Sequence, residues 1–302
     1  MSAFYDDAVK ITGENRIKTN EKLSRYTTFK IGGKADYIAE PENAEQIKAL
    51  IDLCGKHDVP YFILGKGSNV LASDKGYKGM IIHINDGMNN ITVDGCRITA
   101  EAGASLIKVA RTARDNGLTG MEFASGIPGT VGGAVYMNAG AYDGEIKNIV
   151  ASVKALDKNG KIYNISGKDM NFSYRHSLAE EKDLIITKTV FELEKGDISG
   201  IDEKMQQLAE KRREKQPLEY PSAGSTSKRP EGYFAGKLIM DSGLRGYSVG
   251  DAEISEKHCG FVINKGNATA GDVMKLISDV KSRVYENFGV NLEMEIKKLG
   301  EF

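Results

Sequence analysis

The residues most able to do chemistry in this chain form an uncharged, glycine-rich stretch between Ala124 and Ala141. Glycine lets the backbone approach a ligand without a Cβ in the way, and N–H groups freed from hydrogen-bond ladders bind phosphate oxygens. Because the stretch has no charged side chain, amide dipoles rather than lysines would hold an anion there. We interpret it as a loop system around the diphosphate of a nucleotide cofactor. The alternative is a run of tight turns in a β-rich domain.

A second glycine cluster, Gly65 to Asn69, follows the predicted buried strand at 61–64. It begins like the G-x-G-x-x-G motif of dinucleotide-binding folds, but Val70 stands where the third glycine belongs and no long amphipathic helix follows. That motif requires a strand, a glycine turn and a helix in this order, so a Rossmann site is excluded. The chain therefore has two glycine-rich anion loops about 60 residues apart. We expect neither to lie at a helix N-terminus of the usual kind.

Three polar sets could supply reactive side chains. In the first, Arg175 lies in the segment Phe172–Ser177, and an arginine beside aromatic residues suits a planar carboxylate, which it grips with two parallel hydrogen bonds. The second set, Ser222–Pro230, combines small residues with two cations and could hold a phosphate or orient one hydroxyl. In the third, Leu292–Ile296, two glutamates alternate with apolar residues. The alternatives are an exposed arginine on a strand edge, a solvated turn and a polar strand face.

Together these sets match a known family. Over nearly its whole length the chain resembles the UDP-N-acetylenolpyruvoylglucosamine reductases, the MurB enzymes, in its shorter, second-type subgroup. The motifs that carry the resemblance are residues 26–33, 64–69, 126–134, 173–175, 223–226, 235–239 and 257–261, and Glu295. The motifs at 26–33 and 126–134 are specific in combination, and the order and spacing of all of them also fit.

The resemblance implies a flavoenzyme of α+β class. Its members bind FAD non-covalently in a two-part domain of the vanillyl-alcohol-oxidase (PCMH) type, which is followed by a smaller α+β substrate-binding domain. NADPH reduces the flavin, and hydride then passes to the enolpyruvyl group of UDP-N-acetylglucosamine enolpyruvate to give UDP-N-acetylmuramate. The implied setting is peptidoglycan synthesis in the cytoplasm, with its links to cell wall biogenesis, cell shape, the cell cycle and cell division.

The resemblance also implies residue roles. Ser225 would be the proton donor, and Arg175 and Glu295 would stabilise the enol form of the substrate carboxylate. The residues expected to hold FAD are Gly65, Lys66, Gly67, Ser68, Asn69, Gly126, Ile127, Gly129, Thr130, Gly132, Gly133, Ala134, Asn138 and Ala139. Those expected to face the substrate are Tyr174, Lys215, Lys228, Lys257 and His258.

Elementary chemistry agrees with these roles. Hydride addition to an enolpyruvyl ether places charge on the carboxylate, so a cation is needed where that charge develops. A serine donates a proton only to a strongly basic carbanion that is already within reach. Glu295 beside a carboxylate would repel it if both were ionised, which favours a protonated Glu295. Ser227 and Cys259 depart from the family pattern, which has an aromatic residue and an alanine at these places.

The elements that must position these residues follow from hydrophobic periodicity. Apolar residues at helical spacing predict four helices: 47–54 after the cap Asn43, 106–113 after Ser105, 204–215 before Pro217, and 273–284. Predicted strands cover 36–39, 59–64, 80–84, 91–94, 97–101, 150–156, 161–165, 184–194 and 260–264, with a hairpin turn at 157–160.

This pattern, together with the family resemblance, predicts three parts. Residues 1–80 would form the first FAD-binding subdomain, with residues 296–302 returning to it. Residues 81–200 would form the second subdomain, and residues 201–295 the substrate-binding domain.

Composition limits the partners. With 41 basic and 42 acidic residues the net charge is −1, so no global field attracts nucleic acid or anionic lipid. We expect no membrane span, no signal peptide and a monomer. Three widely spaced cysteines and four scattered histidines argue against a disulfide framework and a metal site, and favour a reducing cytoplasm.

Two alternatives of other kinds stay open at this point. One is a different FAD oxidoreductase of the same superfamily, many of which attach the flavin to a histidine in the first glycine loop; Gly65–Asn69 contains none. The other is a non-catalytic protein that binds a flavin or a nucleotide sugar.

Overall fold

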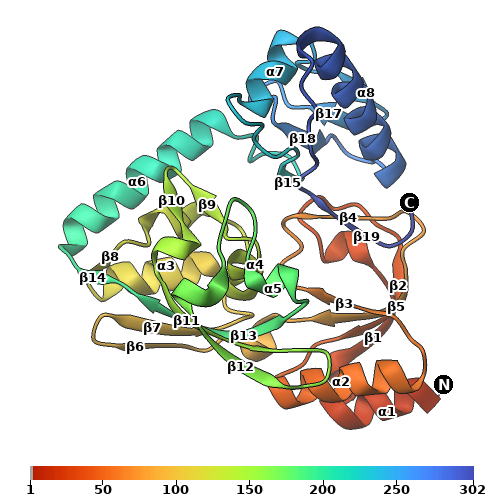
Figure 1. Cartoon of the computed structure of the whole chain (residues 1–302). Helices are drawn as coiled ribbons and strands as arrows, with labels where there is room; N and C mark the ends of the chain where they lie inside the picture. Colours follow the sequence, from red (N-terminus) through yellow and green to blue (C-terminus); the bar gives the residue numbers. More distant parts are fainter. Residues whose placement is uncertain (1–2) are drawn as a thin grey trace. The chain divides into compact units, whose positions relative to one another are not determined.

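The computed structural model describes residues 3–302, which divide into two compact units (Figure 1). Unit 1 consists of residues 3–18, 37–66 and 79–212, and unit 2 of residues 19–36, 67–78 and 213–302. Each unit has its own cluster of buried apolar side chains. The predicted three-part division at residues 80, 200 and 295 stays a prediction.

A five-stranded antiparallel sheet forms the centre of unit 1, with the strand order β12-β11-β13-β7-β6. The β11–β12 hairpin turns where predicted: the Gly160 N–H donates to the Asp157 carbonyl at 2.9 Å, and Gly160 has φ +77°. The strands are β6 (Ile91–Asp94), β7 (Arg97–Glu101), β11 (Val150–Leu156), β12 (Ile162–Ser166) and β13 (Ile185–Glu192).

A four-stranded sheet has the order β1-β2-β5-β3, and the division between the units falls within β1, β2 and β5. β3 and β5 are parallel, and Leu64 pairs with His83 at their carboxyl ends. The first glycine cluster therefore leaves this sheet directly beside His83. The strands are β1 (Ile17–Lys22), β2 (Lys34–Ala39), β3 (Tyr61–Leu64) and β5 (Tyr77–His83).

The helices of unit 1 carry apolar faces that complete its core. α1 and α2 pack side by side (Figure 1), and Asn43 caps α2 by accepting a hydrogen bond from the Gln46 N–H. α6 begins six residues before the predicted helix, and its last three residues belong to unit 2. The helices are α1 (Ala3–Thr12), α2 (Ala44–Lys56), α3 (Leu106–Asp115), α4 (Val131–Tyr136), α5 (Leu178–Glu181) and α6 (Ile198–Lys215).

Unit 2 is built on the antiparallel sheet β15-β18-β17-β16, against which α8 packs. α8 has a capping box between Thr269 and Asp272 and ends at Gly289 in a left-handed conformation. The elements are β15 (Ser222–Ser225), β16 (Ser248–Val249), β17 (Ala252–Ile254), β18 (Phe261–Asn264), α7 (Ala235–Asp241) and α8 (Ala270–Phe288).

Three short strand pairs join loops within the units. In unit 2, β4 (Val70–Ala72) pairs in parallel with β19 (Lys297–Leu299), so the end of the chain lies beside the segment that follows the first glycine cluster. In unit 1, β9 (Gly140–Ala141) pairs with β10 (Gly144–Glu145), and β8 (Leu118–Thr119) pairs with β14 (Glu194–Lys195).

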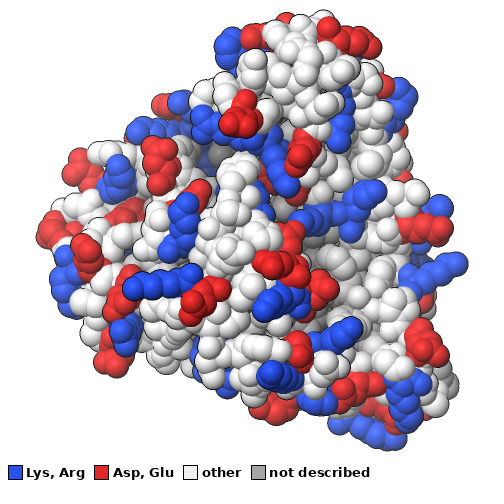
Figure 2. All heavy atoms as spheres, in the orientation of Figure 1, with Lys and Arg blue, Asp and Glu red and all other residues white. Residues whose placement is uncertain are grey.

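The predicted helices and strands are present, with ends that shift by a few residues. Sequence periodicity missed α1, α4, α5, α7, β1 and most of the two- to four-residue strands. α4, α5 and the short strands have too few residues to show a period, whereas α1 has ten residues, as many as the predicted α3. Figure 2 shows basic and acidic side chains interspersed over the visible face, in keeping with the balanced composition. No helix among residues 3–302 is long and apolar enough to span a membrane.

Candidate functional site

A cavity of about 220 Å³ lies in unit 1 between the two glycine-rich segments. The first segment contributes Lys66 and the second contributes Gly129 and Thr130. The remaining walls come from the turn after β5 and from the start of α3. Their residues are Asn85, Asp86, Asn89, Gly103, Ser105 and Lys108.

Main-chain donors border this cavity. Within the described chain, no hydrogen-bond partner is found for the amide N–H groups of Lys66, Gly129 and Thr130. By contrast, the carbonyl of Gly129 accepts from Leu106 N–H at 3.0 Å, which holds the second segment against α3. Amides that are oriented and unpaired bind phosphate oxygens well. Two lysines, Lys66 and Lys108, also line the cavity. The composition of the second loop had indicated that main-chain amides alone would hold an anion, whereas the cavity also offers two positive charges.

The two glycine-rich segments touch at Gly65. A Cβ on Gly65 would lie 2.4 Å from Oγ1 of Thr130, so only glycine allows this approach. Thr130 is the N-cap of α4, and its Oγ1 accepts from the Gly133 N–H. The prediction that neither loop lies at a helix N-terminus was therefore wrong for the second loop. It was missed because α4 has only six residues, two of them glycines.

A buried histidine supports the first glycine segment. Nδ1 of His83 lies 3.2 Å from Oε1 of Glu40, and the His83 ring also forms a hydrogen bond to the backbone of Gly65. Lys18 donates to the same Glu40 oxygen at 3.0 Å. Burial lowers the pKa of His83, although the hydrogen bonds to Glu40 and Gly65 oppose the shift. This row of polar groups holds the peptide of Gly65 in place.

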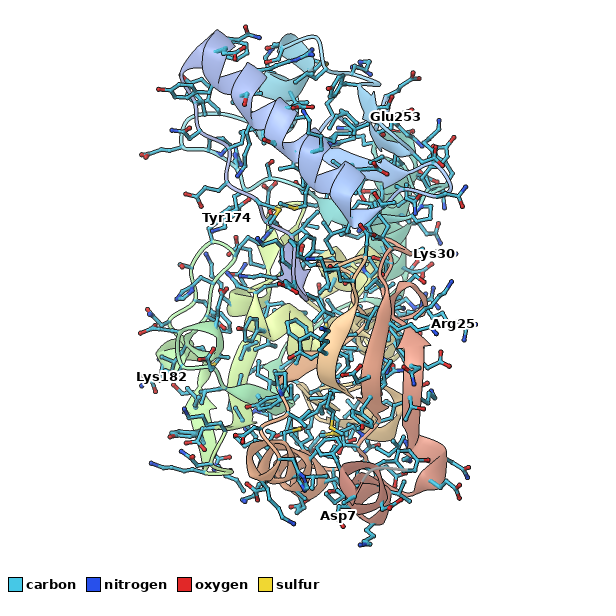
Figure 3. The ribbon with its side chains drawn as sticks, turned by 90° about the vertical axis from the view of Figure 1, so that its right-hand side faces the viewer. Asp7, Arg25, Lys30, Tyr174, Lys182 and Glu253 are labelled. Carbon is cyan, nitrogen blue, oxygen red and sulfur yellow. The ribbon has the colours of Figure 1, made fainter. Side chains whose placement is uncertain are left out.

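Arg175 lies in unit 1 on a tight turn that precedes α5 (Figure 3 labels its neighbour Tyr174). Ser173 and His176 close the turn with two reciprocal main-chain hydrogen bonds of 3.2 Å. The Arg175 guanidinium lies over the ring of Tyr174, 4.9 Å from its centroid. A cation fixed in this way is suited to grip a carboxylate.

Asn138 and Ala139, which were predicted to contact the cofactor, are both buried. The side chain of Asn138 bonds to Glu145, to Lys147 N–H and to the carbonyl of Ser173. Gly132 packs so closely that a Cβ there would lie 3.0 Å from the Cβ of Ala102. These residues therefore build the support of the second loop.

In unit 2, Ser225 and Glu295 lie on adjacent antiparallel segments. The Glu295 N–H donates to the carbonyl of Thr226 at 2.9 Å, and Ser227 pairs with Met294. Ser225 follows a bulge in the pairing of β15 with β18, where Gly224 has φ +76°. Such a bulge turns the next side chain away from the regular ladder.

The environments of these two side chains differ. The Ser225 hydroxyl donates to the carbonyl of Ser227 at 3.1 Å and is partly exposed. Glu295 is only 8% exposed. The Ser225 hydroxyl is thus already ordered by a hydrogen bond, and the buried Glu295 side chain lies on the segment that pairs with the Ser225 segment.

Asn69 of the first glycine segment is hydrogen-bonded to the strand segment of unit 2 that carries Glu295. Its side-chain amide donates to the carbonyl of Glu295 at 3.2 Å, and its own carbonyl accepts from Lys297 N–H at 2.9 Å. Gly67, in the left-handed conformation, packs against Tyr26, where a Cβ would meet the Tyr26 carbonyl at 2.2 Å. Two hydrogen bonds therefore fix the segment Gly67–Asn69 against the segment that carries Glu295.

The predicted substrate-facing residues of unit 2 have varied surroundings. Lys228 pairs with Glu293 at 3.2 Å, and Lys257 pairs with Glu219 at 3.7 Å. Burial lowers the pKa of His258, and the positive charge of Lys215 lowers it further. Nδ1 of His258 accepts from the Gly260 N–H at 3.1 Å, so its Nε2 carries the proton in the neutral ring.

Sequence reasoning did not single out Lys108 or Arg212. Lys108 lies two residues after the start of α3, where it looks like an ordinary exposed lysine. Arg212 packs against Gly126, where a Cβ would come within 3.1 Å of the Arg212 Cδ. Burial lowers the pKa of this guanidinium, which the nearby Tyr142 partly offsets. Burial and the contact with Gly126 distinguish Arg212 from the other charged residues of α6, and neither can be seen in the sequence.

Comparison with known families matches most of the chain. Residues 35–166 match the model of an FAD binding domain. Residues 216–299 match the model of the C-terminal domain of UDP-N-acetylenolpyruvoylglucosamine reductase.

Relatives with that name cover the chain almost end to end. The one from Caldanaerobacter subterraneus is 50% identical over 296 residues, which is 98% of each chain. The one from Agathobacter rectalis is 52% identical over 295 residues and 94% of each chain.

Solved structures agree. The UDP-N-acetylenolpyruvylglucosamine reductase (MurB) from Thermus caldophilus superposes with a TM-score of 0.81 at 33% identity, over 94% of this chain and 99% of that one. A variant of Phl p 4, a glucose oxidase, has a TM-score of 0.51 at 15% identity over 96% of this chain and 59% of that one, which indicates a shared fold alone. The expected α+β fold class with an FAD-binding domain is confirmed.

Proposed function

This chain belongs to the UDP-N-acetylenolpyruvoylglucosamine reductases, FAD-dependent oxidoreductases of peptidoglycan precursor synthesis, and on that premise we propose roles for its residues. The reaction reduces the enolpyruvyl group of UDP-N-acetylglucosamine enolpyruvate to give UDP-N-acetylmuramate. We further propose that NADPH is the reductant and that FAD is bound without a covalent link.

The residues of unit 1 fit the diphosphate part of FAD. The cavity of about 220 Å³ is bordered by the unpaired amides of Lys66, Gly129 and Thr130 and by the side chain of Lys108. The close approach of Gly65 to Thr130 keeps the two loops near enough to share one anion. The FAD-binding set proposed here comprises Gly65, Lys66, Gly67, Ser68, Asn69, Gly126, Ile127, Gly129, Thr130, Gly132, Gly133, Ala134 and Ala139.

Bound FAD supplies the hydride for the reduction. In the proposed mechanism Arg175 pairs with the carboxylate of the enolpyruvyl group and stabilises the negative charge that develops there. Ser225 donates the proton to the neighbouring carbon, which requires its hydroxyl to turn away from the carbonyl of Ser227. Glu295, buried beside the Ser225 segment, assists Arg175 at the carboxylate.

Cationic and aromatic residues would hold the rest of the sugar nucleotide. Lys215, Lys228 and Lys257 offer positive charge for the diphosphate, and the Nε2 proton of His258 offers a directional donor. Tyr174 is 44% exposed beside Arg175 and can contact the substrate at the carboxylate end. Because Lys228 and Lys257 pair with exposed glutamates, substrate binding would exchange one ion pair for another.

The observation that carries the mechanism is the direct pairing of the Ser225 and Glu295 segments, in which the Glu295 N–H bonds to the Thr226 carbonyl. Mixing the purified protein with NADPH and UDP-N-acetylglucosamine enolpyruvate should oxidise NADPH in proportion to the substrate. The product should gain two hydrogens by mass spectrometry. NADPH oxidation that leaves the enolpyruvyl group intact would contradict the proposal.

For the cellular setting we propose a monomer in the cytoplasm, with no nucleic-acid or membrane partner. The three cysteines, Cys54, Cys96 and Cys259, are free thiols, which suits a reducing compartment. Burial raises the pKa of Cys54 to about 11, so this thiol is unreactive at neutral pH. Roles in cell shape, the cell cycle and cell division would follow from the supply of peptidoglycan precursor.

A further inference from the structure

Asn138 is a fully buried polar residue whose side chain joins three segments of unit 1. Its amide nitrogen Nδ2 donates to Oε2 of Glu145 at 3.1 Å and to the carbonyl of Ser173 at 2.9 Å. Its Oδ1 accepts from Lys147 N–H at 2.9 Å. The residue is 0% exposed and has φ +45°, a left-handed conformation that asparagine tolerates better than most residues.

One of these segments is the turn that carries Arg175. Ser173 and His176 close this four-residue turn, and Arg175 is its third residue with φ +55°. A type II turn requires positive φ at that place and prefers glycine or asparagine there. A residue with a Cβ persists in this conformation only when its surroundings impose it. The hydrogen bond from Asn138 to the Ser173 carbonyl is such a constraint, because Ser173 is the first residue of the turn.

The second segment places a carboxylate against the Asn138 amide. Glu145 lies on β10, in the hairpin whose turn residues Tyr142 and Asp143 both have positive φ. The pKa of Glu145 is lowered: burial alone would raise it, but the bonds to Lys147 and Asn138 and the positive charge of Arg175 outweigh burial. Lys147 Nζ lies 2.7 Å from the same carboxylate oxygen that Asn138 binds. One N–H of the Asn138 amide is therefore held by the Glu145 carboxylate, while the other holds the backbone of the Arg175 turn.

We propose that Asn138, oriented by its hydrogen bond to Glu145, is a positioning residue for Arg175, and that Asn138 is not a ligand of the cofactor. The two N–H bonds of the Asn138 amide are both used within the protein, so none is left for a flavin or phosphate oxygen. This revises the role that the family resemblance implied for Asn138. The proposal rests on the role of Arg175 proposed above.

Two variants separate geometry from charge. Asn138→Asp has nearly the same shape and keeps an acceptor for Lys147 N–H, but it removes both donated bonds and places a second carboxylate beside Glu145. Glu145→Gln keeps the acceptor for Asn138 and removes only the charge. In the double variant Asn138→Asp/Glu145→Gln, the new Gln amide can donate to the new carboxylate, which reverses the pairing.

The matched control is Asn171→Asp. Asn171 has φ +47°, and its Nδ2 donates to a glutamate, Oε2 of Glu181, at 3.1 Å, four residues before Arg175. It therefore copies the residue type, the left-handed backbone and the carboxylate partner. Among the described residues it makes no direct hydrogen bond to the Arg175 turn, which its partner Glu181 approaches only at 3.8 Å from His176 Nε2. Circular dichroism and FAD titration of the apoprotein would first verify folding and cofactor affinity for every variant.

Two readouts are expected to move. Reoxidation of the NADPH-reduced protein by substrate should slow by about ten- to a hundredfold in Asn138→Asp, because a small misplacement of a substrate-gripping group costs up to this factor. Tryptic cleavage after Arg175 should be faster, because a released turn reaches the protease. FAD affinity should stay within about twofold. The double variant should recover part of both effects. Glu145→Gln, which keeps an acceptor for Asn138, should change each readout by less than Asn138→Asp does, and Asn171→Asp should behave like the unmodified protein.

A background of Arg175→Ala distinguishes the outcomes. If Asn138 acts through Arg175, Asn138→Asp should add almost nothing to the slower reoxidation of that background. If Asn138→Asp slows reoxidation further in the Arg175→Ala background, the proposal is overturned. It is also overturned, in favour of Asn138 as a cofactor ligand, if Asn138→Asp weakens FAD binding but reoxidises normally at saturating FAD. If Arg175→Ala alone reoxidises normally, the role proposed for Arg175 fails. In proteins that keep Arg175, tryptic cleavage after this residue would still decide whether Asn138 holds the turn. Unchanged cleavage in Asn138→Asp would refute that role of Asn138.

Discussion

The main-chain N–H of Glu295 donates a 2.9 Å hydrogen bond to the carbonyl of Thr226, the residue that follows Ser225. Thr226 is also tied to β18, because its N–H donates to Gly260 and its Oγ1 accepts from Val262 N–H. The proposed proton donor and the buried carboxyl are therefore held by strand pairing rather than by a mobile loop. Their spacing is preorganised before substrate arrives, as efficient catalysis requires.

Ser225→Ala should separate the two half-reactions. Reduction of the bound flavin by NADPH needs no proton from Ser225, whereas reduction of the enolpyruvyl group does. Loss of a general acid typically costs ~10²–10⁴ in rate, or about 3–5 kcal/mol. Stopped-flow bleaching by NADPH should stay near that of the unmodified protein, while reoxidation by substrate should fall by at least the lower end of that range. Equal slowing of both steps would assign Ser225 an organising role instead.

Arg175→Lys should impair substrate reduction although the charge is kept. A lysine ammonium cannot form the two parallel hydrogen bonds that a guanidinium makes to a carboxylate. Loss of one charge-assisted hydrogen bond costs about 1.5–3 kcal/mol, which corresponds to a ~10- to 150-fold slower reoxidation by substrate. Steady-state kinetics and stopped-flow reoxidation would measure it. Turnover like that of the unmodified protein would place Arg175 outside the substrate site.

Denaturation should release FAD from the purified protein. The first glycine loop, Gly65–Asn69, contains no histidine or cysteine to which a flavin could be attached. After acid or heat treatment and filtration, the flavin should appear in the filtrate with the mass of FAD. Flavin that stays with the precipitated chain would contradict this.

Gly65→Ala should weaken FAD binding. The new Cβ would lie 2.4 Å from Oγ1 of Thr130, so the Thr130 side chain must move and give up its cap on α4. Loss of such a cap costs about 1 kcal/mol, apart from the displacement of the cofactor loop. FAD titration of the apoprotein and thermal unfolding would measure both effects.

Gly55→Ala is the control for that substitution. Gly55 lies in α2, and a Cβ there would meet no atom within 4 Å. Alanine is the better helix former, so this variant should be stabilised by up to ~1 kcal/mol with unchanged FAD binding. If both glycine variants lost FAD equally, the contact between Gly65 and Thr130 would not be the reason.

Stability should fall as the pH is lowered from 7. Burial lowers the folded-state pKa of His83 below its ordinary value of 6.5. The pKa of Glu40 is also lowered: burial would raise it, but Lys18 and His83 outweigh burial. In both cases the unfolded chain binds protons more readily than the folded one. The loss therefore begins near pH 6.5 through His83 and continues below pH 4.5 through Glu40.

His83→Asn tests this assignment. An asparagine has no ionisable ring, so the melting temperature should change less between pH 7 and pH 5.5 than in the unmodified protein. Melting curves at several pH values would show the difference. A parallel decline in both proteins would assign the acid sensitivity to other groups.

Local patterns were sufficient for much of the fold. Asn43 and the apolar spacing after it predict α2, and the structure contains that helix with the Asn43 cap. Asp157 to Gly160 predicts the turn between β11 and β12, which is also present. These features depend on residues within a few positions of one another, so their physical cause lies in the sequence itself. The glycine-rich stretches and the family motifs likewise identified FAD as the cofactor without any coordinates.

Tertiary structure decided what these residues touch. α4 forms among glycines because Thr130 caps it and because its apolar residues Val131, Ala134 and Val135 are buried, neither of which its weak helix propensity reveals. Asn138 bonds to Ser173, 35 positions away, and Asn69 bonds to Glu295, 226 positions away. Such partners are chosen by how strands and loops pack around two cores. The sequence therefore determined the family, the cofactor and the residue types of the site, whereas only the packed chain decided which polar groups are satisfied by protein and which are left for a ligand.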